Sequence, residues 1–177
     1  LSVPRHRDIF GFPVKNYYVA LGFDFSVEDW TGLAREYHDY YGETSRASPL
    51  REGIMEILQA LRAQAMPMSV LSACELSILD RMLRDRGIRD FFPHIRGLTD
   101  LFASSKLEQG RALMAEVGLP PGQVLLIGDT IHDHEVAREL GCRCLLVAGG
   151  HQAEHRLARC GCPMVYAISE LSLPSTI

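Results

Sequence analysis

Two carboxylates that are one helical turn apart offer the clearest chemistry in the sequence. The apolar, strand-like run Leu125–Ile127 is followed by Gly128 and Asp129, and Asp133 comes four residues after Asp129. If a helix begins near Thr130, both carboxylates can point into one space above the strand. Such a pair suits Mg²⁺, which usually takes one or two protein carboxylates together with water and substrate phosphate. An alternative stays open, in which Asp129 caps the helix and Asp133 improves the electrostatics of its first turn.

A hydroxyl at the end of another predicted strand offers a site for an anion. Ser72 ends the apolar run Met68–Leu71 and is followed by Ala73, Cys74 and Glu75. We expect its hydroxyl and the exposed N–H groups of a new helix to lie together, which is an arrangement that suits phosphate. Ser-x-x-Glu is also a capping-box pattern, in which Ser72 and Glu75 satisfy backbone donors reciprocally. The two roles are compatible.

Lys106 is unusual in a chain that otherwise uses arginine for positive charge. Among the 18 basic residues only Lys15 and Lys106 are lysines. Lys106 falls at the start of a predicted helix over 105–117, where the helix dipole disfavours a cation by about 0.3–1 kcal/mol. A compact ammonium group placed there suits a phosphoryl group. A solvated surface lysine is the alternative interpretation.

The elements that must position these side chains alternate along residues 46–177. Strands are predicted at 68–71, 94–98, 124–127, 144–147 and 164–168, and helices at 50–64, 105–117 and 155–159, around 78–83 and around 136–140. Strands that alternate with helices favour an α/β fold with a parallel sheet covered on both faces. Ligands bind beyond the C-terminal ends of such strands. The polar residues that directly follow strands are therefore the candidate site residues.

Residues 1–45 differ from the rest of the chain in composition and pattern, because aromatic side chains are concentrated there and helical patterns dominate. No strand is convincing in this part. The polar stretch over 43–49 is rich in turn residues and ends in proline, so it is typical of a linker. We predict two domains, over residues 1–45 and 46–177.

Charge and hydropathy exclude several classes of function. The 177-residue chain is 47% apolar and carries a mild net charge of −4, which is spread without the long like-charge runs of a nucleic-acid-binding arm. No apolar stretch approaches the roughly 20 residues that span a bilayer, and no secretion pattern is present at the start. We expect a cytoplasmic protein without nucleic-acid or membrane partners.

The chain contains five cysteines. An odd number in a chain without a secretion signal indicates reduced thiols. They are Cys74, Cys142, Cys144, Cys160 and Cys162. The last four form two closely spaced pairs. Structural zinc sites usually have two to four residues between paired ligands, so the single intervening residue in each pair argues against zinc.

The candidate residues occur in the order of a known family. Ser72, then Lys106, then Gly128–Asp133 follow successive predicted strand ends, and in this the chain resembles the haloacid dehalogenase superfamily. Ser72 matches the second motif of that family, Lys106 the third, and Gly128–Asp133 the fourth, GDxxxD. Residues 1–45 resemble the C-terminal part of the helical cap found in phosphoglycolate-phosphatase-like members. The resemblance implies a Rossmann-like three-layer α/β core with a parallel sheet and a partial helical cap.

The resemblance also implies a reaction and roles for the candidate residues. It implies a Mg²⁺-dependent phosphatase that acts on a small phosphorylated metabolite through an aspartyl-phosphate intermediate. In that account Asp129 binds Mg²⁺, and Asp133 binds the metal or orients it through water. Lys106 clamps the nucleophile and the phosphate, while Ser72 and the Ala73 N–H hold a phosphoryl oxygen. The protein is expected to be a monomer or a homodimer.

Two rival functions belong to the same resemblance. A 2-haloacid dehalogenase of this superfamily attacks carbon and needs no Mg²⁺, and the Asp129/Asp133 pair favours the phosphatase over it. A truncated or degenerate member would bind a partner or phosphate without turnover. The absence of the first motif of the family favours this second rival.

The first motif, DxDx(T/V), supplies the nucleophile in the family and is absent here. The segment most similar to it is Phe23–Ser26, but no apolar strand precedes this segment. Asp24 is better interpreted as a helix cap or turn residue. The chain alone is therefore expected to be inactive.

The missing motif also has a structural consequence, because in the family its strand lies between the strands that end at Leu71 and Gly128. Each buried N–H or C=O group without a partner costs about 1–3 kcal/mol, and domains have only about 5–15 kcal/mol of stability. We therefore expect additional N-terminal residues in the natural protein, or another segment or chain that fills the gap. In this chain Val70 and Ile127 should not lie on directly paired strands.

Overall fold

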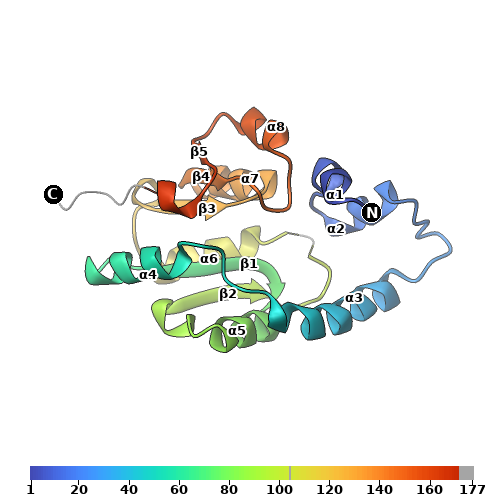
Figure 1. Cartoon of the computed structure of the whole chain (residues 1–177), viewed down its shortest axis with the longest axis horizontal. Coiled ribbons are helices and arrows are strands. Elements are labelled where there is room, and N and C mark those ends of the chain that lie inside the picture. Colours follow the sequence, from blue (N-terminus) through green and yellow to red (C-terminus); the bar gives the residue numbers. More distant parts are fainter. Residues whose placement is uncertain (104, 172–177) are drawn as a thin grey trace.

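The computed structural model describes residues 1–103 and 105–171, and within them helices alternate with short parallel strands after residue 50 (Figure 1). The predicted range 46–177 thus ends outside the described residues. The α-helices are α1 (Val3–Ile9), α2 (Val14–Ala20), α3 (Trp30–Thr44), α4 (Ile54–Ala63), α5 (Leu76–Asp85), α6 (Leu107–Val117), α7 (Ile131–Leu140) and α8 (Glu154–Leu157). The strands are β1 (Ser69–Glu75), β2 (His94–Leu98), β3 (Leu125–Gly128), β4 (Arg143–Val147) and β5 (Met164–Val165).

The strands form two separate parallel sheets, β1-β2 and β3-β4-β5, and the second lies above the first in Figure 1. Val70 of β1 pairs with Ile95 of β2, whereas Ile127 of β3 pairs with Leu145 of β4. The prediction that Val70 and Ile127 do not lie on directly paired strands is confirmed.

One edge of β1 and one edge of β3 are left open. Among residues 1–103 and 105–171, no strand pairs with the edge of β1 opposite β2 or with the edge of β3 opposite β4. Leu125 and Ile127 share one face of β3 and are 44% and 46% exposed. Strands of parallel sheets are normally covered on both faces, so these two apolar side chains mark a surface that lacks its usual cover.

Helix α6 connects the two halves, because it contacts β1 and β2 of one sheet and α7 beside the other. The approach is close at Gly110, where an added Cβ would lie 2.9 Å from Leu140 Cδ1 of α7 and 3.2 Å from Leu71 Cδ2 of β1. A larger side chain at this position would push α6 away from both neighbours. Gly110 therefore helps to set the position of Lys106, the residue just before α6.

Each half has its own apolar core. Around the β1-β2 sheet a cluster of buried side chains joins α4, α5 and the turn after α5, and consists of Leu58, Leu79, Leu83, Ile88 and Phe91. The second core lies around β4, where Val136 and Ala137 of α7 and Leu146, Val147 and Leu157 are buried. Each core holds one group of site residues in place.

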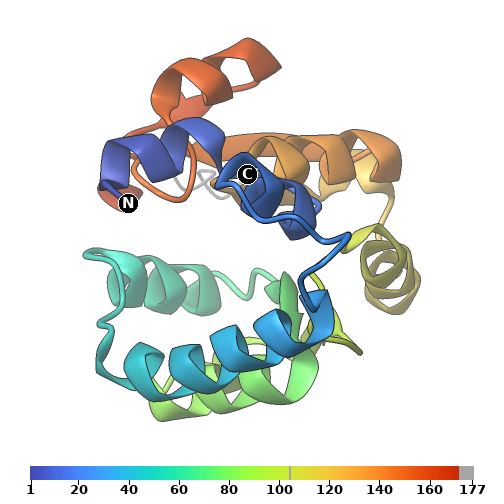
Figure 2. The same cartoon turned by 90° about the vertical axis from the view of Figure 1, so that its right-hand side faces the viewer.

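The helices of residues 1–45 lie along both halves, and no strand is formed among them, as predicted. Helix α1 lies near α8, while the C-terminal end of α3 and the 3₁₀-helix that follows it adjoin α5 (Figures 1 and 2). The stretch over 43–49 differs from the predicted linker, because α3 continues to Thr44 and a short 3₁₀-helix follows at Ser45–Ala47. Arg86 donates hydrogen bonds to the carbonyl groups of Ser45 and Ser48, which fixes this segment against the end of α5.

None of the helices in the described part of the chain has both the length and the apolar character needed to cross a bilayer.

Candidate phosphate and metal site

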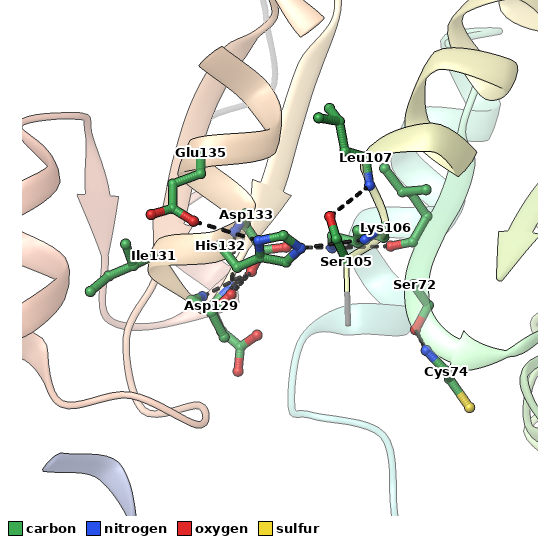
Figure 3. Close-up of polar contacts among 12 residues, drawn as sticks. Ser72, Cys74, Ser105, Lys106, Leu107, Asp129, Ile131, His132, Asp133 and Glu135 are labelled. Carbon is green, nitrogen blue, oxygen red and sulfur yellow. Dashed lines mark hydrogen bonds and ion pairs between the residues drawn. The ribbon is translucent and has the colours of Figure 1, made fainter. Parts of the chain in front are cut away.

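A buried ion pair between Lys106 and Asp133 lies at the centre of the site (Figure 3). Lys106 Nζ lies 2.5 Å from Asp133 Oδ1 and 3.4 Å from the Leu71 carbonyl oxygen of β1. The two residues are only 9% and 4% exposed, so the alternative of a solvated surface lysine at position 106 is wrong. The ammonium group thus joins the end of the first sheet to the helix that follows β3.

The pKa of Asp133 reflects two opposing effects. Burial raises it, but the charge and hydrogen bond of Lys106, together with the hydrogen bonds from Thr130, outweigh burial and hold the pKa below its usual value. A carboxylate that is stabilised in this way stays ionised at neutral pH. Asp133 therefore keeps its negative charge opposite Lys106.

Asp133 is also part of a capping box at the start of α7. Thr130 is the N-cap, and its side chain accepts a hydrogen bond from the Asp133 N–H, while Asp133 Oδ2 accepts from the Thr130 N–H at 2.9 Å. The same oxygen accepts from the Asp129 N–H at 3.1 Å. The helix cap is thus Thr130 and not Asp129, so the side chain of Asp129 is not used to cap α7. Thr-x-x-Asp is a capping-box-like pattern, and this signal in the sequence was missed.

Asp129 directly follows β3, as the sequence predicts, and lies above the strand end. Its Oδ2 accepts a hydrogen bond from the His151 N–H at 2.9 Å. The chain approaches closely here, because a Cβ added to Gly150 would lie 1.9 Å from Asp129 Oδ2. Similarly, a Cβ at Gly128 would lie 2.2 Å from Asp133 Cγ. Both glycines leave room for a carboxylate.

Ser72 lies in β1 and does not start a helix. The strand continues irregularly to Glu75, and the Glu75 side chain caps α5 by accepting from the N–H groups of Ser77 and Ile78. The predicted capping box between Ser72 and Glu75 is therefore wrong. The expectation that Ser72 and Ala73 adjoin the N–H groups of a helix start is also wrong, because α5 begins only at Leu76.

Ser72 nevertheless lies on the side of the site formed by β1 (Figure 3). Its Oγ accepts a hydrogen bond from the Cys74 N–H at 3.1 Å. The hydroxyl proton is still available for donation, since a serine hydroxyl can accept and donate at once. The neighbouring Leu71 carbonyl accepts from Lys106, so Ser72 and Lys106 belong to one side of the site.

His132 supports Lys106 from α7. Its Nε2 is 3.4 Å from the Lys106 backbone nitrogen, which donates to it, and its ring packs on Phe12 with centroids 4.8 Å apart. Burial, followed by the positive charge of Lys106, lowers the pKa of His132. A neutral imidazole can accept the backbone N–H, whereas an imidazolium cannot.

Residues 148–156 hold the N-terminal segment against the site. Gln152 is 2% exposed, and its side chain accepts from the Ile131 N–H at 2.7 Å and donates to the Phe10 carbonyl at 2.8 Å. Arg156 donates to the same carbonyl, and Arg7 donates to the Gly149 and Gly150 carbonyls. These contacts join segments that are distant in sequence, so no local sequence pattern predicts them.

Two other residues singled out in the sequence lie outside this group. Asp24 Oδ1 accepts from the N–H and hydroxyl of Ser26, so it is a turn residue, as predicted. Lys15 Nζ lies over the Phe25 ring, 5.2 Å from its centroid. The contacts of both residues are with the segment between α2 and α3.

The two carboxylates differ in how freely they could bind Mg²⁺. Within residues 1–103 and 105–171, no three His, Cys, Asp or Glu side chains gather as they would around a metal ion. Asp129 Oδ1 accepts no hydrogen bond from the described residues, so it retains lone pairs for a cation, whereas both oxygens of Asp133 are engaged. This donor set fits an ion that takes one carboxylate and completes its shell with water and phosphate.

Comparison with known proteins agrees with this arrangement. The family model described as "Haloacid dehalogenase-like hydrolase" matches residues 2–147. A phosphoglycolate phosphatase of Thiobacillus denitrificans is 32% identical over 118 residues, covering 65% of this chain and 52% of that protein. A phosphoglycolate phosphatase of Synechococcus elongatus is 27% identical over 122 residues, covering 69% and 56%. The chain thus spans about half the length of these relatives.

Solved structures share the fold. A predicted phosphatase from Clostridium acetobutylicum superposes with a TM-score of 0.79 at 20% identity, over 91% of this chain and 76% of that one. A haloacid-dehalogenase-like protein from Agrobacterium tumefaciens gives 0.78 at 23% identity, over 97% and 81%. At these identities the likeness concerns the fold alone.

Proposed function

The chain belongs to the haloacid dehalogenase-like hydrolases, and from this premise we propose that it carries most of the active site of a Mg²⁺-dependent phosphatase. The proposed substrate is a phosphate monoester of a small metabolite, with 2-phosphoglycolate as the first candidate, because the curated relatives are phosphoglycolate phosphatases. Residues 1–45 would form part of a helical cap and residues from 46 onward the core. A cytoplasmic location and a monomeric or homodimeric state stay predictions.

The single observation that carries the proposal is the buried Lys106–Asp133 pair beside Asp129. Lys106 would hold the phosphate and the attacking carboxylate, since a fixed ammonium in a partly dry site offsets developing negative charge on oxygen. Asp133 would act by positioning, because it fixes the Lys106 ammonium and the Asp129 N–H at the same time. An exposed lysine would not hold its ammonium group in one position. It would also lie in water, where its charge is screened more strongly than in this partly buried site.

Asp129 is the residue proposed to hold Mg²⁺, through the oxygen that accepts no hydrogen bond from the described residues. The ion would supply positive charge that stabilises the oxygens of the phosphoryl group. Asp133 would contribute through water and through its hold on the Asp129 backbone, because both of its own oxygens already accept hydrogen bonds. The site therefore differs from one with two direct carboxylate ligands.

Ser72 and Ala73 are proposed to contact a phosphoryl oxygen from the β1 side. The Ser72 hydroxyl proton is the donor for this contact, and the Ala73 backbone N–H is the second. Lys106 also contacts β1 at Leu71, so these donors and the ammonium group can approach the same anion.

The attacking carboxylate is proposed to arrive on a further strand that lies between β1 and β3. This proposal rests on the open edges of the two strands and on the exposed face formed by Leu125 and Ile127. A strand there would end beside Asp129 and Lys106, because parallel strands present their C-terminal ends at the same edge. The strand would belong to a segment outside residues 1–177 or to another chain.

The experiment is an assay of phosphate release by the natural polypeptide, compared between the wild type and two variants. We expect release from 2-phosphoglycolate that depends on Mg²⁺ and is lost in Asp129→Asn. Asp39→Asn is the matched control, because Asp39 is an exposed residue of α3. Its activity should equal that of the wild type.

Two outcomes would overturn the proposal. Turnover that is unaffected by removal of Mg²⁺ or by Asp129→Asn would contradict the role of the site and would favour a haloacid dehalogenase if haloacids are hydrolysed. An absence of phosphate release from a panel of small phosphate monoesters would favour a non-catalytic binding protein.

A further inference from the structure

Three cysteine thiols lie near one another beside β4 and β5 of the β3-β4-β5 sheet. Cys144 lies in β4, Cys160 ends the short 3₁₀-helix after α8, and Cys162 lies two residues before β5. All three are free and half-buried. The phosphatase proposal uses none of them.

The pairing of β4 with β5 places Cys144 opposite Cys162. The strands are parallel, Leu146 pairs with Met164, and the Leu146 N–H donates to the Pro163 carbonyl at 2.9 Å. Cys144 lies two residues before Leu146 in β4, and Cys162 lies two residues before Met164, just outside β5. The two thiols are neighbours, because the Cys162 thiol is close enough to act on the pKa of Cys144.

The spacing of neighbouring strands is compatible with a disulfide. Neighbouring strands lie about 4.8 Å apart, and disulfides join residues whose Cα atoms are about 4.4–6.8 Å apart. The other cysteine near β4 has a different neighbour, because Cys142 Sγ lies 3.7 Å from Met114 Sδ of α6. Among the described residues, no group of three or more potential ligands suits a metal, so a shared metal ion does not explain the gathered thiols.

Burial keeps the Cys144 thiol protonated. Burial, and then the adjacent Cys162 thiol, raise the pKa of Cys144 to about 12. Cys144 therefore holds its proton at neutral pH and is a slow nucleophile, since the thiolate is the reactive form.

We propose that Cys144 and Cys162 form a reversible intramolecular disulfide when the protein meets a small-molecule disulfide such as oxidised glutathione. The Cys162 sulfur attacks one sulfur of the oxidant, the S–S bond of the oxidant breaks, and the first glutathione leaves as a thiolate. Cys144 then attacks the Cys162 sulfur and releases the second glutathione. The two cysteine protons end on the two released thiolates, so one oxidised glutathione is reduced as one protein disulfide forms.

The bond would close a loop that contains the contacts of the proposed site. Between Cys144 and Cys162 lie His151, whose N–H donates to Asp129, and Gln152 and Arg156, which donate to the Phe10 carbonyl. Oxidation would thus restrict the segment that holds both Asp129 and the N-terminal helices. The proposal does not depend on the phosphatase activity, since the disulfide can form whether or not the protein turns over a substrate.

The test is peptide mapping of the natural polypeptide after incubation with oxidised glutathione and blocking of the remaining thiols. Cleavage after arginine places Cys142 in peptide 139–143, Cys144 in peptide 144–156, and Cys160 with Cys162 in peptide 160–177. We expect a linked species of peptides 144–156 and 160–177, which disappears on reduction. The species should persist in Cys160→Ser and in the control Cys142→Ser, and should be lost in Cys162→Ser.

Three results would overturn the proposal. They are the absence of any linked species in the wild type, a species that survives in Cys162→Ser but is lost in Cys160→Ser, and a dominant bond between Cys160 and Cys162 within one peptide. The Cys160→Ser variant keeps the test decisive if Cys162→Ser does not fold, because only the Cys144–Cys162 bond can then link these two peptides.

Discussion

The Lys106 ammonium group lies 2.5 Å from Asp133 Oδ1, and this buried pair joins the two separate sheets of the molecule. Lys106 precedes α6 and also contacts Leu71 of β1, whereas Asp133 belongs to the helix that follows β3. The charge that is proposed to hold phosphate is thus fixed by both halves. Its loss should affect stability as well as function.

Lys106→Met should lower the free energy of unfolding by about 3–5 kcal/mol, because it leaves the buried Asp133 carboxylate without its countercharge. Urea unfolding followed by circular dichroism measures this change. Lys15→Met is the matched control, since Lys15 is exposed and surface substitutions usually change stability by less than about 0.5 kcal/mol. Equal stabilities of the two variants would contradict the burial of the pair.

Asp133 should make the protein less stable in acid. Its pKa in the folded chain lies below the ordinary value of 3.8. A lowered carboxyl pKa contributes stability that is present above the unfolded pKa and is lost as pH falls through the folded pKa. The difference in unfolding free energy between wild type and Asp133→Asn should therefore be greatest above about pH 5 and shrink below about pH 4. A difference that grows on acidification would show that the pKa of Asp133 is raised.

Gly150→Ala should weaken Mg²⁺ binding about tenfold or more, a typical effect of disturbing residues that orient a ligand. The new Cβ would lie 1.9 Å from Asp129 Oδ2 and 2.6 Å from Asp129 Cβ, so the whole side chain must move. Titration calorimetry of the natural polypeptide with Mg²⁺ measures the affinity. Gly122→Ala is the control, because a Cβ there meets nothing within 4 Å. Unchanged affinity in Gly150→Ala would count against Asp129 as the ligand.

Gln152→Ala should cost about 1–3 kcal/mol of stability, because it leaves the Ile131 N–H without a partner. The Phe10 carbonyl would also lose the Gln152 amide, but it would keep Arg156 as a donor. The exposed Gln59 of α4 provides the control, and Gln59→Ala should be nearly neutral. Thermal unfolding of both variants measures the difference. A Gln152→Ala variant as stable as Gln59→Ala would mean that water replaces both hydrogen bonds at no cost.

Much of the fold could be predicted from the sequence because its strands are short apolar runs with clear ends. The strand at His94–Leu98 has the predicted bounds, and Asp129 follows its strand as expected. The position of Ser72 differs from the prediction for a physical reason. The strand continues past Leu71 through an irregular stretch, so the helix begins after Glu75, and a local Ser-x-x-Glu pattern cannot report such a continuation.

The contacts between the site residues could not be predicted from the sequence. Lys106 could be identified as anomalous, yet its contact with Asp133 depends on how α6 packs against α7 at Gly110. Gln152 carries no local pattern, because its role exists only once Ile131 and Phe10 are brought to it. Contacts of this kind are set by tertiary packing, which the periodicity of single segments does not contain.

The most direct test of the central claim is to identify which carboxylate becomes phosphorylated when the natural polypeptide turns over 2-phosphoglycolate with Mg²⁺. The reaction would be quenched in acid, the acyl phosphate reduced with borohydride, and the modified residue located by peptide mapping. The account predicts modification of an aspartate outside residues 1–177, on the strand proposed between β1 and β3, with Asp129 and Asp133 unmodified. Modification of Asp129 or Asp133 would contradict it, because these residues would then attack the phosphate and not position it.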